Sequence, residues 1–249
     1  MAEFPHDTVK LIQQALTKYG LTSTILQSGI LAVVSTEGSF YPKDEISWKN
    51  TPVSRIRIYF ADRVKHLTDA QLDAIKKDDR QFFELVYGYQ TTIGKSLGNT
   101  LPGDGYKYIG RGFNGITGKK LYEKYGNAIG VDLVNNPARL NELPVAAAAL
   151  AVYFSDNFKN VLSRFGLSNP NQVKDLETAT RMSFQVNAGP GTNIDANAGL
   201  REEFQKQLVN VKKLYELART NPGKTGGLLA LLLFGLGTAL FFLNRENKN

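Results

Sequence analysis

The sequence contains no cysteine and only two histidines, His6 and His66. The absence of cysteine excludes disulfides, thiolate nucleophiles and cysteine-ligated metal sites. Because the two histidines are far apart in the sequence, a histidine-based zinc site or a Ser–His–Asp triad has little support. The phosphate-binding pattern GxxxxGK[ST] is also absent. Catalysis would therefore rely on carboxylates, hydroxyls and amides, and we expect neither a metal nor an organic cofactor.

Long runs of basic residues are missing as well, although the chain as a whole is basic. Thirty Lys and Arg residues stand against 23 Asp and Glu residues, which gives a net charge of +7. A basic protein favours an anionic partner, such as a wall polymer or a membrane surface. Because the charge is spread along the chain, we do not expect nucleic acid as a partner. The N-terminal residues lack the basic start and apolar centre of a signal peptide.

Alternation of apolar and polar residues, the pattern of half-buried strands, is scarce. Apolar residues instead recur at helical spacing, and we expect a mainly α fold. Helices are predicted over 8–19, 23–38, 68–79, 143–158, 169–186 and 200–219. Thr68 is a suitable N-cap for the third of these. The 249 residues suffice for a sizeable core, and we expect one domain over residues 1–218 followed by a linker over 219–225.

The chain ends differently. Residues 226–243 carry no charge over 18 positions, and a polar tail follows over 244–249. At 1.5 Å per residue such a helix would reach roughly 27 Å, close to the hydrocarbon thickness of a bilayer. We expect a C-terminal transmembrane helix that binds the lipid membrane. A buried core helix and a cleaved sorting signal are the alternatives, and the flanking basic residues leave the orientation open.

Two carboxylates lie upstream of an unusual block of glycines and aromatic residues. The block GDGYKYIGRGFNGITGKKLYEKYG spans Gly103–Gly126. Glycines let a backbone approach a ligand closely, and aromatic faces stack on sugar rings. Glu37 closes an apolar helix beside Gly38, where partial burial would favour the protonated form that a general acid needs. Glu45 follows eight residues later, and such a pair is the minimum set for glycoside cleavage.

The segments TEGSF, DEISW, the glycine-rich block and VDLVNNP occur in this order at characteristic spacings. Over residues 25–201 the chain resembles glycoside hydrolase family 19, which includes chitinases and, more closely, cysteine-free phage and bacterial endolysins that cut peptidoglycan. The resemblance implies a lysozyme-like α-helical glycosidase domain whose glycine-rich block forms part of the floor of a substrate cleft. The expected partner is therefore the glycan strand of peptidoglycan.

The resemblance also implies roles for individual residues. Glu37 matches the general acid that protonates the glycosidic oxygen, and Glu45 matches the second acidic residue, a base that activates or holds the water. Thr117 matches a threonine that positions this water. Asn187 and Arg201 match substrate-binding residues. The remaining residues that we expect to contact substrate are Trp48, Tyr108, Arg111 and Phe113.

The chain departs from the family pattern at three places. Thr36 replaces the histidine before the catalytic glutamate, Gly115 replaces a glutamine, and Ala188 replaces the first of two glycines. These changes affect subsite contacts, and with them glycan preference and rate. The acid and the base are both retained.

Simpler structural roles are open for most of these residues. Thr117 is a suitable cap for the helix that follows it. Arg111 could anchor loop carbonyls, Asp104 could brace its own turn, and Asn187 could satisfy a turn. Tyr106, Tyr108 and Phe113 could serve packing rather than stacking.

The sequence thus predicts hydrolysis of β-1,4 bonds in wall glycan with inversion at the anomeric carbon. Inversion requires the two carboxyl groups to lie roughly 6.5–9.5 Å apart. With the membrane segment, the expected location is a phage virion with an internal membrane or a bacterial envelope. A chitinase, a lytic transglycosylase and a non-catalytic, membrane-tethered glycan-binding virion protein are the alternatives.

Overall fold

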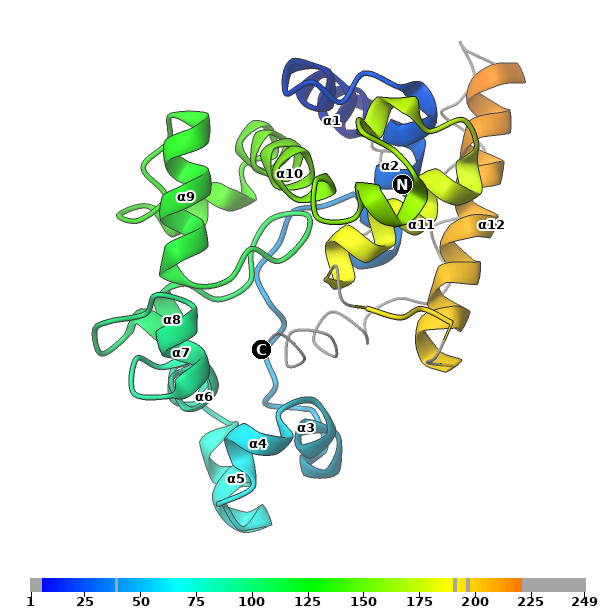
Figure 1. The fold of residues 1–249 in the computed structure, drawn as a ribbon. Coiled ribbons are helices and arrows are strands. Elements are labelled where there is room, and N and C mark those ends of the chain that lie inside the picture. The colour runs from blue at the N-terminus through cyan, green and yellow to red at the C-terminus, as the bar shows by residue number, and fades with distance from the viewer. Residues whose placement is uncertain (1–5, 39, 190–191, 196–197, 221–249) are drawn as a thin grey trace. The chain divides into compact units, whose positions relative to one another are not determined.

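The computed structural model describes residues 6–38, 40–189, 192–195 and 198–220. Within these ranges the chain is helical, with one isolated β-bridge and no strand, which confirms the mainly α prediction. The chain divides into two compact units. The first unit comprises residues 1–42 and 146–249, and the second unit comprises residues 43–145. Figure 1 follows the elements along the chain. The range 1–218, for which a single domain was expected, contains all of the unit 43–145 and most of the other unit.

The segment expected to cross a membrane, residues 226–243, lies outside the described residues. Among the helices that are described, none combines the length and apolar character needed to span a bilayer.

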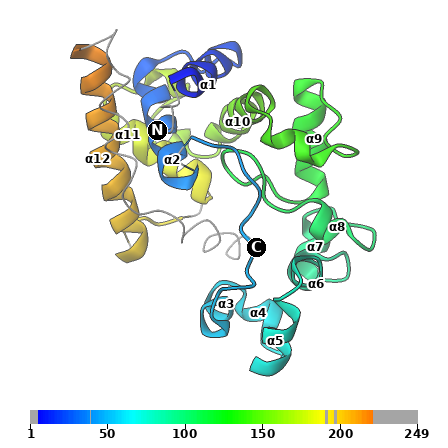
Figure 2. The same cartoon turned by 180° about the vertical axis from the view of Figure 1, so that it is seen from behind.

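The first unit consists of long helices from both ends of the sequence. Its elements are α1 (His6–Lys18), α2 (Thr24–Gly38), most of α10 (Leu143–Phe158), η2 (Leu162–Phe165), η3 (Pro170–Gln172), α11 (Leu176–Ala188) and α12 (Ala198–Thr220). The helices α1, α2, α10 and α12 begin within two residues of the predicted positions, whereas α11 begins seven residues after its predicted start, because η3 occupies residues 170–172. Figures 1 and 2 show α12 running beside α11 and α2.

The contact between α2 and α11 depends on a glycine. A Cβ built on Gly29 would lie 2.6 Å from the carbonyl carbon and oxygen of Ala179. No real side chain approaches backbone so closely, so only glycine allows the two helices to pack at this distance. Phe184 of α11 and Phe204 of α12 pack against the same layer, with ring centroids 6.2 Å apart. The two helices that carry Glu37 and Asn187 are therefore held firmly together.

The second unit consists of shorter helices and tight turns. Its elements are α3 (Val53–Tyr59), α4 (Ala61–Val64), α5 (Asp69–Ile75), α6 (Asp79–Tyr87), α7 (Thr92–Ser96), α8 (Asp104–Lys107), α9 (Lys119–Ile129) and η1 (Pro137–Asn141). Between α8 and α9, Arg111 and Ile116 exchange backbone hydrogen bonds and form a small hairpin. Every residue from Tyr108 to Gly118 is buried. The central part of the glycine-rich block, residues 108–118, is thus packed into this unit, while residues on either side of it are exposed.

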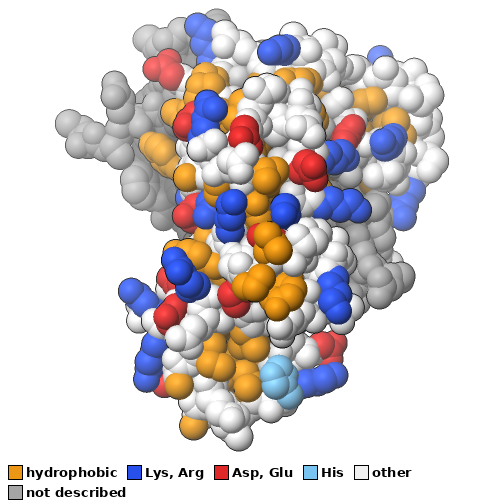
Figure 3. Space-filling model, turned by 90° about the vertical axis from the view of Figure 1, so that its left-hand side faces the viewer, with side chains coloured by type: hydrophobic (Ala, Val, Ile, Leu, Met, Phe, Trp, Pro, Cys, Tyr) orange, Lys and Arg blue, Asp and Glu red, His pale blue; other side chains and the backbone are white. Residues whose placement is uncertain are grey.

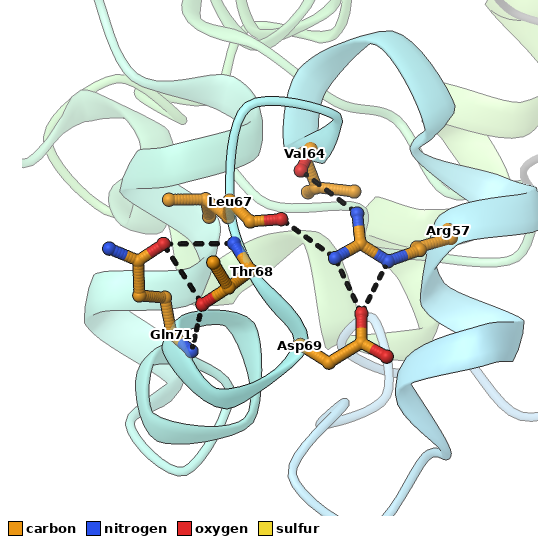
Figure 4. Close-up of polar contacts among 6 residues, drawn as sticks. All are labelled: Arg57, Val64, Leu67, Thr68, Asp69 and Gln71. Atoms are coloured by element: carbon orange, nitrogen blue, oxygen red, sulfur yellow. Dashed lines mark hydrogen bonds and ion pairs between the residues drawn. The ribbon is translucent and has the colours of Figure 1, made fainter.

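A polar network joins α3 to the start of α5 (Figure 4). The guanidinium of Arg57 donates to Asp69 Oδ1 and to the carbonyls of Val64 and Leu67. Thr68 caps α5: its hydroxyl accepts from the Gln71 N–H, and the Gln71 side chain accepts from the Thr68 N–H. This reciprocal capping box satisfies two helix-end donors, and the predicted N-cap is confirmed.

Candidate active site

Glu37 and Asn187 form a direct contact in the first unit. Glu37 is half-buried in the last turn of α2, as the sequence predicted. Asn187 lies in the last turn of α11 and donates from Nδ2 to Glu37 Oε1 at 2.8 Å. Next to them, Gln207 of α12 donates to the hydroxyl of Thr36 at 2.9 Å. The end of α2 thus presents a carboxylate oriented by an amide from a helix far away in the sequence.

Glu45 is held by two different donors in the second unit. The Tyr87 hydroxyl donates to Oε1 at 3.1 Å, and the Gly110 N–H donates to Oε2 at 3.2 Å. The Glu45 N–H in turn donates to the Gly110 carbonyl at 2.6 Å, which pairs this segment with the glycine-rich block. The carboxylate is half-buried, and its orientation is set by the backbone of residue 110 and by a phenol.

Thr117 and Glu45 flank the same point above Gly110. A Cβ built on Gly110 would lie 3.3 Å from Glu45 Oε2 and 3.3 Å from Thr117 Oγ1. Thr117 donates its hydroxyl hydrogen to the Gly115 carbonyl at 2.9 Å, which directs its lone pairs elsewhere as acceptors. Glu45 Oε2 and Thr117 Oγ1 therefore lie close to each other beside the backbone of Gly110, where both can act as acceptors.

The alternative role of Thr117 as a helix cap is wrong. The N-cap of α9 is Gly118, with a φ of 88°, and the N–H of Lys119 donates to Asn99 Oδ1 at 3.0 Å, not to Thr117. The positive φ of Gly118 separates Thr117 from the first turn, so its hydroxyl turns back into the hairpin instead.

Arg111 acts as an anchor within the second unit. Its Nη1 donates to the Lys107 carbonyl at 2.8 Å and to the Tyr122 hydroxyl at 2.9 Å, and its Nε pairs with Asp44 Oδ1 at 2.8 Å. Burial raises the pKa of Tyr122. Arg111 thus holds one backbone carbonyl, at the end of α8, together with two side chains, and its contact with substrate stays a prediction.

The predicted role of Asp104 as a turn brace is also confirmed. Its carboxylate accepts from the backbone N–H groups of Thr100 and Leu101, at 2.8 and 3.0 Å.

The aromatic residues expected to contact glycan lie mostly in the interior. Trp48 is 3% exposed and packs on Phe60 and Phe82, with ring centroids 4.9 and 6.0 Å away. Tyr108 and Phe113 are 1% and 2% exposed. The burial of Tyr108 and Phe113 agrees with the alternative that these rings serve packing. Contact of the three rings with glycan stays a prediction.

Arg201 lies in the first turn of α12, where its side chain is exposed. It donates to the backbone carbonyl of Asp195, whose carboxylate pairs with Arg181 at 3.0 Å. Its substrate contact likewise stays a prediction.

The structure reveals three residues of interest that the sequence did not indicate. Tyr87 and Gly110 hold Glu45, and both contacts join segments that are distant in the chain. Glu203 of α12 is the third, because burial raises its pKa to about 7 while nearby Lys206 lowers it. Only helical spacing beside Phe204 could have indicated that Glu203 is partly buried.

The surface charge is mixed on the face drawn in Figure 3, where Lys and Arg side chains are interspersed with acidic and hydrophobic ones. Among the described residues, no group of three or more His, Asp or Glu side chains is arranged to hold a metal ion. In comparisons by sequence, no protein-family model and no curated protein matched this chain.

Proposed function

We propose that this protein hydrolyses β-1,4 glycosidic bonds in the glycan of bacterial cell walls, by acid and base catalysis with inversion. Glu37 is the general acid that protonates the glycosidic oxygen. Glu45 is the base that takes a proton from the attacking water, and Thr117 accepts the other hydrogen of that water. The resemblance of the sequence to family 19 endolysins supports this assignment.

The observation that carries the proposal is the proximity of Glu45 Oε2 and Thr117 Oγ1 beside Gly110. Each oxygen lies 3.3 Å from where a Cβ of residue 110 would be, and both can accept a hydrogen bond from one water. A carboxylate can act as the base only if it lies within hydrogen-bond reach of the water, and its pKa matters only when this condition is met. Because residue 110 is a glycine, no side chain of its own lies between these two oxygens.

The general acid requires a different environment from that of the base, and the surroundings of Glu37 differ from those of Glu45. It is half-buried at a helix end and accepts a hydrogen bond from a neutral amide, Asn187. Two carboxylates in unlike surroundings are the usual basis for dividing acid and base roles. Their separation of roughly 6.5–9.5 Å, which inversion requires, stays a prediction.

We further propose that residues 226–243 tether the enzyme to a lipid bilayer, in a virion with an internal membrane or in a bacterial envelope. Their apolar, uncharged sequence and the net positive charge of the chain support this proposal.

The product of the reaction tests the proposal. Full-length protein is incubated with purified sacculi and, separately, with chitin oligomers, and mass spectrometry identifies the released ends. Reducing-end muropeptides from sacculi are expected. Release from chitin alone would make the enzyme a chitinase, and anhydro sugar ends would make it a lytic transglycosylase. Sedimentation with sacculi without release would identify a glycan-binding protein.

A further inference from the structure

Tyr87 is the last residue of α6, and its ring is fixed on several sides. The ring is 4% exposed and stacks on Phe83 at 6.1 Å with an interplanar angle of 7°. Phe60 meets it edge-on at 6.3 Å, and the Arg63 guanidinium lies over it at 5.4 Å. An aromatic ring held by these contacts has little rotational freedom, so the direction of its hydroxyl is set before any substrate arrives.

That hydroxyl donates to Glu45 Oε1 at 3.1 Å. The other carboxylate oxygen, Oε2, accepts from the Gly110 N–H and faces the same point as Thr117 Oγ1. With one donor on each oxygen, the carboxylate plane cannot turn without losing a hydrogen bond. The phenol on Oε1 therefore helps to keep Oε2 on the side of Thr117.

We propose that Tyr87 is the positioning residue of the catalytic base, because its fixed hydroxyl holds Glu45 Oε1 and so directs Oε2 toward the water beside Thr117. This inference rests on the proposed function. Tyr87 acts through Glu45, and neither the sequence motifs nor the resemblance indicates it. A hydrogen bond to the charged form of a carboxylate also favours that form, which a base needs.

Other charged and titratable groups surround Glu45 and must be kept constant in a test. Asp44 precedes it in the chain and pairs with Arg111, which also contacts the Tyr122 hydroxyl. Arg63 lies over the Tyr87 ring itself. The substitution Tyr87→Phe retains all of these groups and every ring contact, and it removes only the hydroxyl.

The kinetic test compares full-length wild type with Tyr87→Phe on soluble wall glycan over a range of pH. We expect kcat to fall about tenfold or more, KM to change little, and the acid limb of the kcat profile to move to higher pH by about one unit. The control is Tyr153→Phe, which removes a hydroxyl that donates to the Val186 carbonyl in the first unit. This control variant should leave both limbs of the kcat profile at the pH values of the wild type. An unshifted acid limb in Tyr87→Phe would overturn the inference.

A second measurement does not depend on turnover, so it separates failure of this inference from failure of the proposed function. The titration of the Glu45 carboxyl is followed by ¹³C NMR in wild type and in Tyr87→Phe, with Glu45→Gln to assign the signal. We expect the midpoint to rise in Tyr87→Phe by about one pH unit. An unchanged midpoint overturns the inference even if the enzyme is active. A raised midpoint in a protein that releases no glycan would support the contact while refuting the reaction.

Discussion

Asn187 donates a hydrogen bond to Glu37 across 150 residues of sequence, with Nδ2 and Oε1 2.8 Å apart. Both residues lie in the last turns of their helices, α11 and α2, which pack at Gly29. The amide is neutral, so it orients the carboxyl group without adding a charge beside it. This is the environment that we assign to the general acid.

The first prediction concerns this amide. Asn187→Asp retains the shape of the side chain but replaces the donor with a second carboxylate. Because like charges disfavour ionisation, Glu37 should hold its proton to higher pH, and the basic limb of the pH–rate profile should move upward. Loss of the orienting bond should lower kcat about tenfold or more. A basic limb identical to that of wild type would show that the two residues are not coupled in the active enzyme.

The second prediction uses a single methyl group. Gly110→Ala places a Cβ 3.3 Å from both Glu45 Oε2 and Thr117 Oγ1, next to the two oxygens proposed to bind the water. We expect activity to fall about 100-fold while the melting temperature changes little.

The matched control for this substitution is Gly166→Ala. It adds a methyl group to open space, but at a φ of 64°, so it should cost about 1 kcal/mol of stability and leave activity intact. Equal activity in Gly110→Ala and wild type would refute the water site.

The third prediction separates the hydroxyl of Thr117 from its packing. Thr117 is 1% exposed, and valine matches its shape without the oxygen. Thr117→Val should lose about 1 kcal/mol of stability with the hydrogen bond to the Gly115 carbonyl, and kcat should fall about 100-fold. Thr117→Ser keeps the oxygen and should stay within about tenfold of wild type. If the two variants lose the same activity, the role of Thr117 is packing.

The fourth prediction follows from Glu203. Burial raises its pKa from 4.5 to about 7, so the folded state retains a proton that the unfolded chain releases. The free energy of unfolding should therefore fall as the pH rises from about 4.5 to 7, by up to about 3 kcal/mol. Glu203→Gln should remove this fall in urea titrations at several pH values.

Glu202→Gln is the control for this series, because Glu202 is exposed and a hydrogen bond from Lys206 lowers its pKa. This variant should retain the fall in stability between pH 4.5 and 7. If the free energy of unfolding of Glu203→Gln falls with pH as steeply as that of the wild type, another group is responsible for the pH dependence.

The longer helices were largely predictable from the sequence, because local signals specify them. The apolar spacing before Glu37 predicted α2, and Thr68 as an N-cap predicted the start of α5. The short helices α3, α4, α6, α7 and α8 were not predicted. The half-buried position of Glu37 followed from the same pattern. These features depend on contacts within a few residues, which periodicity and capping chemistry describe well.

The partners of the two carboxylates were not predictable in the same way. Tyr87 lies 42 residues from Glu45, and Gly110 lies 65 residues from it. No local sequence pattern predicts which phenol or which backbone N–H donates a hydrogen bond to a given carboxylate. The division into two units was equally hidden, because α10 continues across the boundary near residue 145. For Thr117, the local signal was misleading: a threonine before a helix suggests a cap, but the positive φ of Gly118 excludes it.

The most direct test of the whole account is the rate at which full-length wild type, Glu37→Gln and Glu45→Gln release reducing ends from purified sacculi. Circular dichroism of each variant should confirm that the fold is retained. The account predicts release by the wild type and a loss of about 1,000-fold in each variant, because each lacks one of the two proton transfers. A folded Glu37→Gln or Glu45→Gln variant that releases reducing ends at the wild-type rate would contradict it.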